Sequence, residues 1–205
     1  MRRCRDRPLV AALLTLAGLA ALIGTGGAGA YLDAPPPAHT GGFGEPTCAA
    51  CHRGAPLDDA TGTLTLAAPA RYAAGEEHVL EVRLARAGME RGGFQLSARF
   101  AEGALAGRQA GVLTVLPEAD PGAQRGAKPP VQVLAAHDIA FASHTAAGAA
   151  LASGGEVRWR VRWRAPAKAA GPVAFHVAAN AGNHDDSELG DFVYLASAIS
   201  RPRSP

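Results

Sequence analysis

Hydrophobic and polar residues alternate along much of the chain, most regularly over residues 156–164. There Val157, Trp159, Val161 and Trp163 occupy every second position, and an arginine follows each of them. A strand places alternate side chains on opposite faces, whereas a helix would mix the two sets. The segment is therefore predicted to be a strand with one buried face.

The same alternation, interrupted by turns rich in Gly, Pro, Asn or Asp, predicts further strands. They are expected at residues 61–67, 80–84, 94–100, 111–116, 131–135, 138–143, 172–179 and 191–199. About nine short strands and almost no helical periodicity indicate an all-β protein. The expected fold is an antiparallel β-sandwich of the immunoglobulin type, with Greek-key connections.

The sandwich is expected to span residues 61–200, with a short tail at 201–205. Residues 31–60 are expected to be an extended lead-in, because their first part contains too much Pro and Gly for a helix or a central strand. Residues 117–130 and 145–155 are rich in Ala and Gly and are expected to be mobile loops.

The first 30 residues have the pattern of a signal peptide. Arginines at positions 2, 3, 5 and 7 precede a largely apolar run from Leu9 to Ile23, which is shorter than the roughly 20 residues that span a bilayer. Cleavage is expected before Tyr31, after the small residues 28–30, and would export the mature chain to the periplasm or the cell exterior. The alternative is an uncleaved N-terminal anchor, and membrane contact is expected only in that case.

The balance of basic and acidic side chains does not indicate a function once the predicted signal peptide is left out. The chain has 20 basic and 18 acidic side chains, of which the first 30 residues hold four and one, so 16 and 17 remain. The remainder has no basic tract, so nucleic acid is not an expected partner. It also lacks a Ser/His/Asp order and a phosphate-binding loop, so no enzyme activity is expected.

The chemistry is concentrated in the motif Cys48-Ala49-Ala50-Cys51-His52. Two thiols three residues apart can each add to one haem vinyl group, and the adjacent imidazole can bind the iron. A zinc site would need a second cysteine pair, and a thioredoxin-like dithiol would need βαβ surroundings. The motif predicts one covalent haem c, with a plain disulfide between the two cysteines as the alternative.

The sixth iron ligand is left open by the sequence. His144 ends an apolar strand and is placed to reach out from a sheet edge, whereas Met89 is the one methionine of the mature chain, in a Gly-rich turn. Histidine would lower the reduction potential and methionine would raise it. His78 and His176 are expected to be ordinary strand residues. An open sixth position would allow ligand sensing or peroxidase-like chemistry.

Several short motifs occur in order across residues 43–199. They are Gly92-Gly93-Phe94-Gln95-Leu96, Ser143-His144-Thr145, Trp163-Arg164-Ala165-Pro166, Phe175-His176-Val177-Ala178-Ala179-Asn180 and Gly190-Asp191-Phe192-Val193-Tyr194. Together they resemble the choice-of-anchor V family of reelin-domain-like bacterial extracellular proteins. The resemblance implies an immunoglobulin/reelin-like sandwich, in many members preceded by C-x-x-C-H. The anchoring tail that the family name presupposes is missing here, which favours a soluble exported protein.

The predicted mature chain also resembles cytochrome f in outline. Both have an N-terminal tyrosine, a C-x-x-C-H a short distance further on, and a largely β body. This resemblance implies the free amine of Tyr31 as another alternative for the sixth ligand.

Two further patterns each have a simpler explanation. Residues 180–188 are rich in oxygen ligands for Ca²⁺, but they do not follow EF-hand spacing and match a solvated connection between strands. The arginines of residues 156–164 would suit docking of an acidic redox partner, or equally a solvated sheet face or a charged edge strand.

The sequence thus predicts an exported monohaem c-type cytochrome that passes single electrons to a redox partner protein whose identity the sequence does not give. The alternative is a reelin-like extracellular adhesion or ligand-binding module without redox activity, in which C-x-x-C-H is vestigial or forms a disulfide.

Overall fold

A computed structural model describes residues 31–116, 128–151, 154–185 and 187–203. The predicted signal peptide and most of the loop expected at 117–130 lie outside these ranges. The strands are β1 Gly62–Ala67, β2 Arg71–Tyr72, β3 Glu77–Arg86, β4 Arg91–Phe100, β5 Val112–Val115, β6 Val131–Ala136, β7 Ile139–His144, β8 Glu156–Arg164, β9 Val173–Gly182 and β10 Phe192–Pro202. In the described ranges helix is limited to two short 3₁₀ turns, η1 Cys48–Ala50 and η2 Gly103–Leu105, and no helix is long and apolar enough to cross a membrane.

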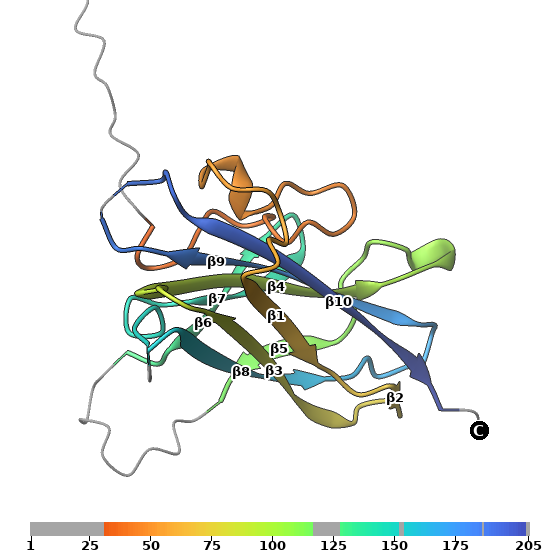
Figure 1. The fold of residues 1–205 in the computed structure, drawn as a ribbon. Helices are drawn as coiled ribbons and strands as arrows, with labels where there is room; N and C mark the ends of the chain where they lie inside the picture. Colours follow the sequence, from red (N-terminus) through yellow and green to blue (C-terminus); the bar gives the residue numbers. More distant parts are fainter. Residues whose placement is uncertain (1–30, 117–127, 152–153, 186, 204–205) are drawn as a thin grey trace, which may run out of the picture.

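The strands form two sheets, as the predicted β-sandwich requires (Figure 1). One sheet has the order β1-β3-β8-β5 and the other β2-β10-β9-β4-β7-β6. All pairs are antiparallel except β10 with β2, which pair in parallel through residues 201–202. The all-β prediction is confirmed. β10 continues through Pro202, so the last strand extends into the segment expected to be a tail.

Aromatic side chains fill the space between the sheets. The Phe94 and Trp159 rings stack at 4.6 Å between centroids, and Trp163 meets Phe175 edge-on at 4.9 Å. Both indole N–H groups donate to backbone carbonyls, at 2.7 and 2.9 Å, so the two large side chains bury no unpaired donor. These tryptophans come from the buried face of β8 that the alternation predicts.

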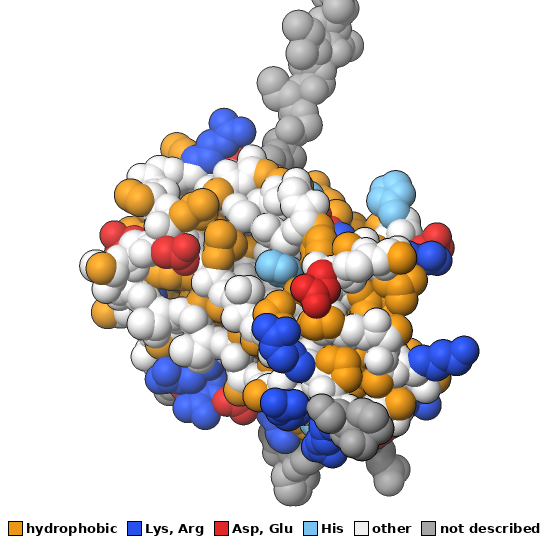
Figure 2. Space-filling model, turned by 90° about the vertical axis from the view of Figure 1, so that its right-hand side faces the viewer, with side chains coloured by type: hydrophobic (Ala, Val, Ile, Leu, Met, Phe, Trp, Pro, Cys, Tyr) orange, Lys and Arg blue, Asp and Glu red, His pale blue; other side chains and the backbone are white. Residues whose placement is uncertain are grey.

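The opposite face of β8 carries the arginines and faces solvent. β8 is a central strand, between β3 and β5, so its charges do not protect a sheet edge. Arg158 pairs with Glu156 at 2.7 Å, and Arg162 lies 3.8 Å from Glu77. On the face that Figure 2 shows, basic side chains gather mainly in the lower half, the level of the four-stranded sheet in Figure 1. The arginine face is thus a solvated sheet surface, partly neutralised by glutamates.

The lead-in covers the outer face of the six-stranded sheet (Figure 1). For this reason β4 is buried on both faces, although its alternating sequence predicts one exposed face. Gln95, Ser97 and Arg99 are the polar residues enclosed in this way. Gln95 accepts a hydrogen bond from the His39 backbone at 2.7 Å, and Arg99 forms an ion pair with Glu45, their side chains being 9% and 10% exposed. Polar contacts therefore attach the lead-in to the sandwich.

His176 of β9 lies under this lead-in, as an outward-facing strand residue. Its ring meets Phe43 edge-on at 5.4 Å, and a side chain in place of Gly42 would collide with it. Burial and the charge of Arg99 lower the pKa of His176. The folded state therefore resists the proton that the unfolded chain takes up below about pH 6.5.

We expect this histidine to make stability depend on pH. The stability it contributes is present above about pH 6.5 and is lost as the pH falls toward the lowered pKa. Urea unfolding should show a larger loss of unfolding free energy between about pH 7.5 and about pH 5 for the wild type than for His176→Gln. His137→Asn, in an exposed turn, is the control for loss of a histidine. Equal pH profiles for the wild type and His176→Gln would contradict the assignment.

Candidate functional site

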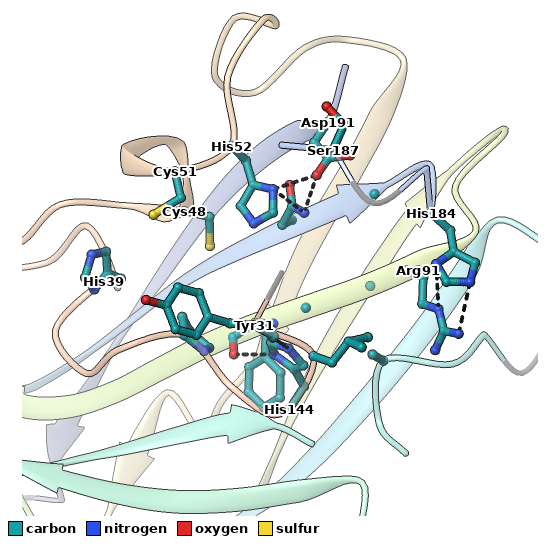
Figure 3. Close-up of a pocket in the computed structure, with 18 of the residues that line it drawn as sticks. Tyr31, His39, Cys48, Cys51, His52, Arg91, His144, His184, Ser187 and Asp191 are labelled. Carbon is teal, nitrogen blue, oxygen red and sulfur yellow. Dashed lines mark hydrogen bonds and ion pairs between the residues drawn. The ribbon is translucent and has the colours of Figure 1, made fainter. Parts of the chain in front are cut away.

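The C-x-x-C-H motif begins with the short 3₁₀ turn η1, which is followed directly by Cys51 and His52. Thr47 caps its start by accepting a hydrogen bond from the Ala49 backbone at 3.1 Å, and the His52 backbone donates to the Cys48 carbonyl at 2.9 Å. This turn brings the two thiols and the imidazole to one side of the lead-in (Figure 3). Cys48 and Cys51 are both free cysteines in this structure.

Two residues at the ends of distant strands orient His52. The ring Nδ1 lies 2.6 Å from Oδ2 of Asp191, which precedes β10, and Asn180 of β9 donates to the same oxygen at 3.0 Å. An ionised carboxylate only accepts, so Nδ1 carries the proton and Nε2 is the nitrogen left for a metal. Burial alone would raise the pKa of Asp191, but the hydrogen bonds from His52 and Asn180 outweigh it and the pKa is lowered.

A cavity of about 120 Å³, partly open to solvent, lies between this turn and the edge of the sandwich. Its walls include apolar side chains such as Leu32, Pro35 and Phe94, together with Cys48, Cys51 and His52. The two cysteines and the histidine that the sequence predicts as haem attachment points therefore line one cavity, which is partly open to solvent.

His144, the last residue of β7, forms another wall of this cavity (Figure 3). Its ring Nδ1 accepts a hydrogen bond from the Phe94 backbone at 3.0 Å, and Nε2 lies 3.3 Å from the Tyr31 carbonyl. Gly93 permits this approach, because a Cβ there would lie 2.8 Å from the ring. Burial lowers the pKa of His144, and the charge of His52 lowers it further. The structure thus brings His144 and His52 to the same site.

Met89 does not reach the cavity. It is 3% exposed and belongs to the hydrophobic core, although its neighbours Gly88 and Glu90 in the turn are exposed. The Gly-rich turn suggested exposure, but the side chain turns inward between the sheets. Tyr31 does line the cavity, where its carbonyl faces His144.

The residues present fit a covalently bound haem. Burial raises the pKa of the Cys48 thiol to about 12, so this sulfur is protonated at neutral pH and is no preformed metal thiolate. Among the described residues, no three His, Cys, Asp or Glu side chains are grouped as a metal site would require. Two thiols, one oriented imidazole and a largely apolar cavity are the set that haem c requires.

In the loop considered for Ca²⁺, described polar groups form hydrogen bonds with one another. Asn183 donates to Asp185 at 3.0 Å, and Asp185 accepts from the Ser187 backbone at 2.9 Å. Asp186 lies outside the described residues. These contacts match a solvated connection between β9 and β10, as the simpler explanation has it.

Sequence reasoning missed several residues of the site. Asp191, a partner of His52, belongs to a motif that was noted only for its resemblance, and Asn180 was considered for chemistry only as part of the loop expected for Ca²⁺. His39 also lines the cavity, with Nδ1 held 3.0 Å from the Pro36 carbonyl. A signal for Asp191 was available, since an acidic residue directly before an apolar strand is placed at a sheet end, but no local pattern connects it with His52.

Comparison with known proteins gives limited matches. No protein-family model and no curated protein matches the chain. Among solved structures, the human F-spondin reeler domain matches 70% of this chain and 88% of its own, at 17% identity and a TM-score of 0.43. A DUF4466 family protein from Parabacteroides merdae matches 67% of this chain and 42% of its own, at 12% identity and a TM-score of 0.35. Both TM-scores are below the usual level for a shared fold, so the sandwich assignment depends on the sheets themselves.

Proposed function

We propose that this protein is an exported monohaem c-type cytochrome that transfers single electrons. Cys48 and Cys51 would bond the haem and His52 would bind its iron. The observation that carries the proposal is the orientation of His52: Nδ1 is engaged by Asp191, so Nε2 is available beside two free thiols on a cavity. The haem iron, when bound, supplies the change between two oxidation states.

The chain's own residues supply the surroundings that electron transfer needs. Asp191 and Asn180 hold the His52 ring, and the apolar wall around Phe94 would shield part of the haem from water. His144 is the proposed sixth ligand, through Nε2. In that role its proton would move to Nδ1, which would then donate to the Phe94 carbonyl at 3.3 Å in place of accepting from the Phe94 N–H. Two histidine ligands favour a low reduction potential.

The proposed location is the periplasm or the cell exterior, since the N-terminal pattern directs export and haem c is assembled outside the cytoplasm. The proposed partner is another redox protein. Catalysis is not part of the proposal, because His52 and His144 together would leave no position on the iron for a substrate.

The deciding experiment is expression with a c-type cytochrome maturation system. The wild type should yield a red protein whose pyridine haemochrome is of the c type and whose haem stays attached after denaturation. The double variant Cys48→Ala/Cys51→Ala should lose covalent haem, since no thioether can form, while Ser187→Ala on the cavity wall should keep it. A colourless wild-type protein from maturation-competent cells would refute the proposal.

The second candidate function is an extracellular ligand-binding or adhesion module. The observation that favours it is the cavity itself, whose apolar side chains would also receive an apolar ligand other than haem. A colourless but folded product that binds an apolar fluorescent probe, and loses it on Gly93→Phe, would support this alternative.

A further inference from the structure

We infer that Asp191 is a positioning residue that lowers the reduction potential of the haem. Its carboxylate accepts a hydrogen bond from His52 Nδ1 and so raises the electron density of the imidazole ring. The inference rests on the proposed function, because it concerns the same axial ligand. It goes further by assigning a specific electronic role to a residue that touches neither the thiols nor the iron position.

The contact has the geometry of a charge-assisted hydrogen bond. His52 Nδ1 and Asp191 Oδ2 are 2.6 Å apart, slightly shorter than the roughly 2.7–2.9 Å that is typical of a charge-assisted N–H···O bond. Asp191 is 4% exposed, so water competes little for its oxygens. In such surroundings a hydrogen bond is stronger than at the surface, and the carboxylate withdraws positive charge from the ring.

The carboxylate is itself held in place. Asn180 Nδ2 donates to Oδ2 at 3.0 Å, and the Asn183 backbone donates to Oδ1 at 3.2 Å. The Asn180 carbonyl oxygen is buried without a partner among the described residues. Flipping the amide would place that oxygen against the carboxylate, so the orientation that satisfies Asp191 prevails at the cost of one unpaired acceptor.

A carboxylate on the outer nitrogen makes an imidazole a more basic ligand. The more anionic ligand stabilises ferric over ferrous iron, since the ferric ion carries one more positive charge. The expected consequence is a lower potential than a neutral acceptor in the same place would give. Hydrogen bonds around the ligands are among the means by which a protein sets haem potentials.

Asp191→Asn and Asp185→Asn form a matched pair for the test. Both residues line the cavity and each substitution removes one negative charge, but only Asp191 contacts His52. Spectroelectrochemical titration of the haem-loaded proteins should show that Asp191→Asn favours the reduced form at least tenfold over the wild type, or about 59 mV for one electron. Asp185→Asn should change the ratio less than about threefold, an estimate for a screened charge without direct contact.

A second measurement does not require the variant to fold. Proton NMR of the haem-free wild-type chain should show a strongly downfield ring N–H signal assigned to His52, and its absence would overturn the inference. If haem attaches but Asp191→Asn and Asp185→Asn have equal potentials, the inference is overturned while the proposed function stands. If no covalent haem forms, the proposed function fails and this inference fails with it.

Discussion

Replacing His144 by alanine is expected to convert the haem-loaded protein from low spin to high spin. Of the candidate side chains for the sixth position, only His144 presents a ring nitrogen to the cavity that His52 faces. Loss of a strong-field axial ligand leaves the iron five-coordinate or bound to water, which weakens the ligand field. Ultraviolet-visible and electron paramagnetic resonance spectra of the ferric protein measure the change, which should involve nearly all of the haem.

Met89→Leu is the matched control for this prediction. Met89 lies in the core, so the substitution should leave the spectrum unchanged and cost less than about 1.5 kcal/mol of stability. If Met89→Leu becomes high spin and His144→Ala does not, the ligand assignment is reversed. If neither variant changes, the sixth position is open or is filled by another group, such as the amine of Tyr31.

Arg99→Leu is expected to destabilise the protein by about 3–5 kcal/mol, the typical effect of removing one partner of a buried ion pair. Its partner Glu45 is almost enclosed, and the Thr40 hydroxyl would be its remaining side-chain donor, at 2.5 Å. An uncompensated carboxylate in that position must either stay charged without a counter-ion or take up a proton. Urea unfolding at neutral pH measures the loss of unfolding free energy.

Two controls test whether the expected loss of stability comes from leaving a buried charge without its partner. Glu45→Gln/Arg99→Leu should recover part of the loss, because no lone charge then remains. Arg158→Leu removes an exposed arginine from the β8 surface and should cost less than about 1 kcal/mol. A loss for Arg99→Leu as small as that for Arg158→Leu would show that Glu45 is stabilised by other means.

Local sequence pattern predicted most of the strands, because apolar and polar residues alternate along a strand that has one buried and one exposed face. Val157, Trp159, Val161 and Trp163 are the clearest example. The strand β2 has only two residues and shows no such alternation. Its parallel pairing with β10 joins residues about 130 positions apart, which a local pattern does not reveal. β4 was predicted with one exposed face because the cover over Gln95 comes from the lead-in, which alternation within β4 does not encode.

The site was predictable where its chemistry is contiguous. Cys48, Cys51 and His52 form one motif, and His144 was singled out by its place at a strand end. Asp191 was not, because its role depends on the pairing of β9 with β10 and on the path of the lead-in above them. Met89 was misplaced for a related reason: a turn's composition indicates where the backbone is exposed, and not where a long side chain points.

The hydrogen bond between His52 and Asp191 joins residues 139 positions apart, which gives the site an order of assembly. During synthesis the C-x-x-C-H turn emerges early, while Asp191 arrives with the last strand. Until β10 pairs with β9, Asp191 is not in place to orient the His52 ring. If the chain is the proposed cytochrome, covalent attachment of the haem would therefore be able to precede folding, whereas the His52 ring would reach its final orientation only after β10 has paired.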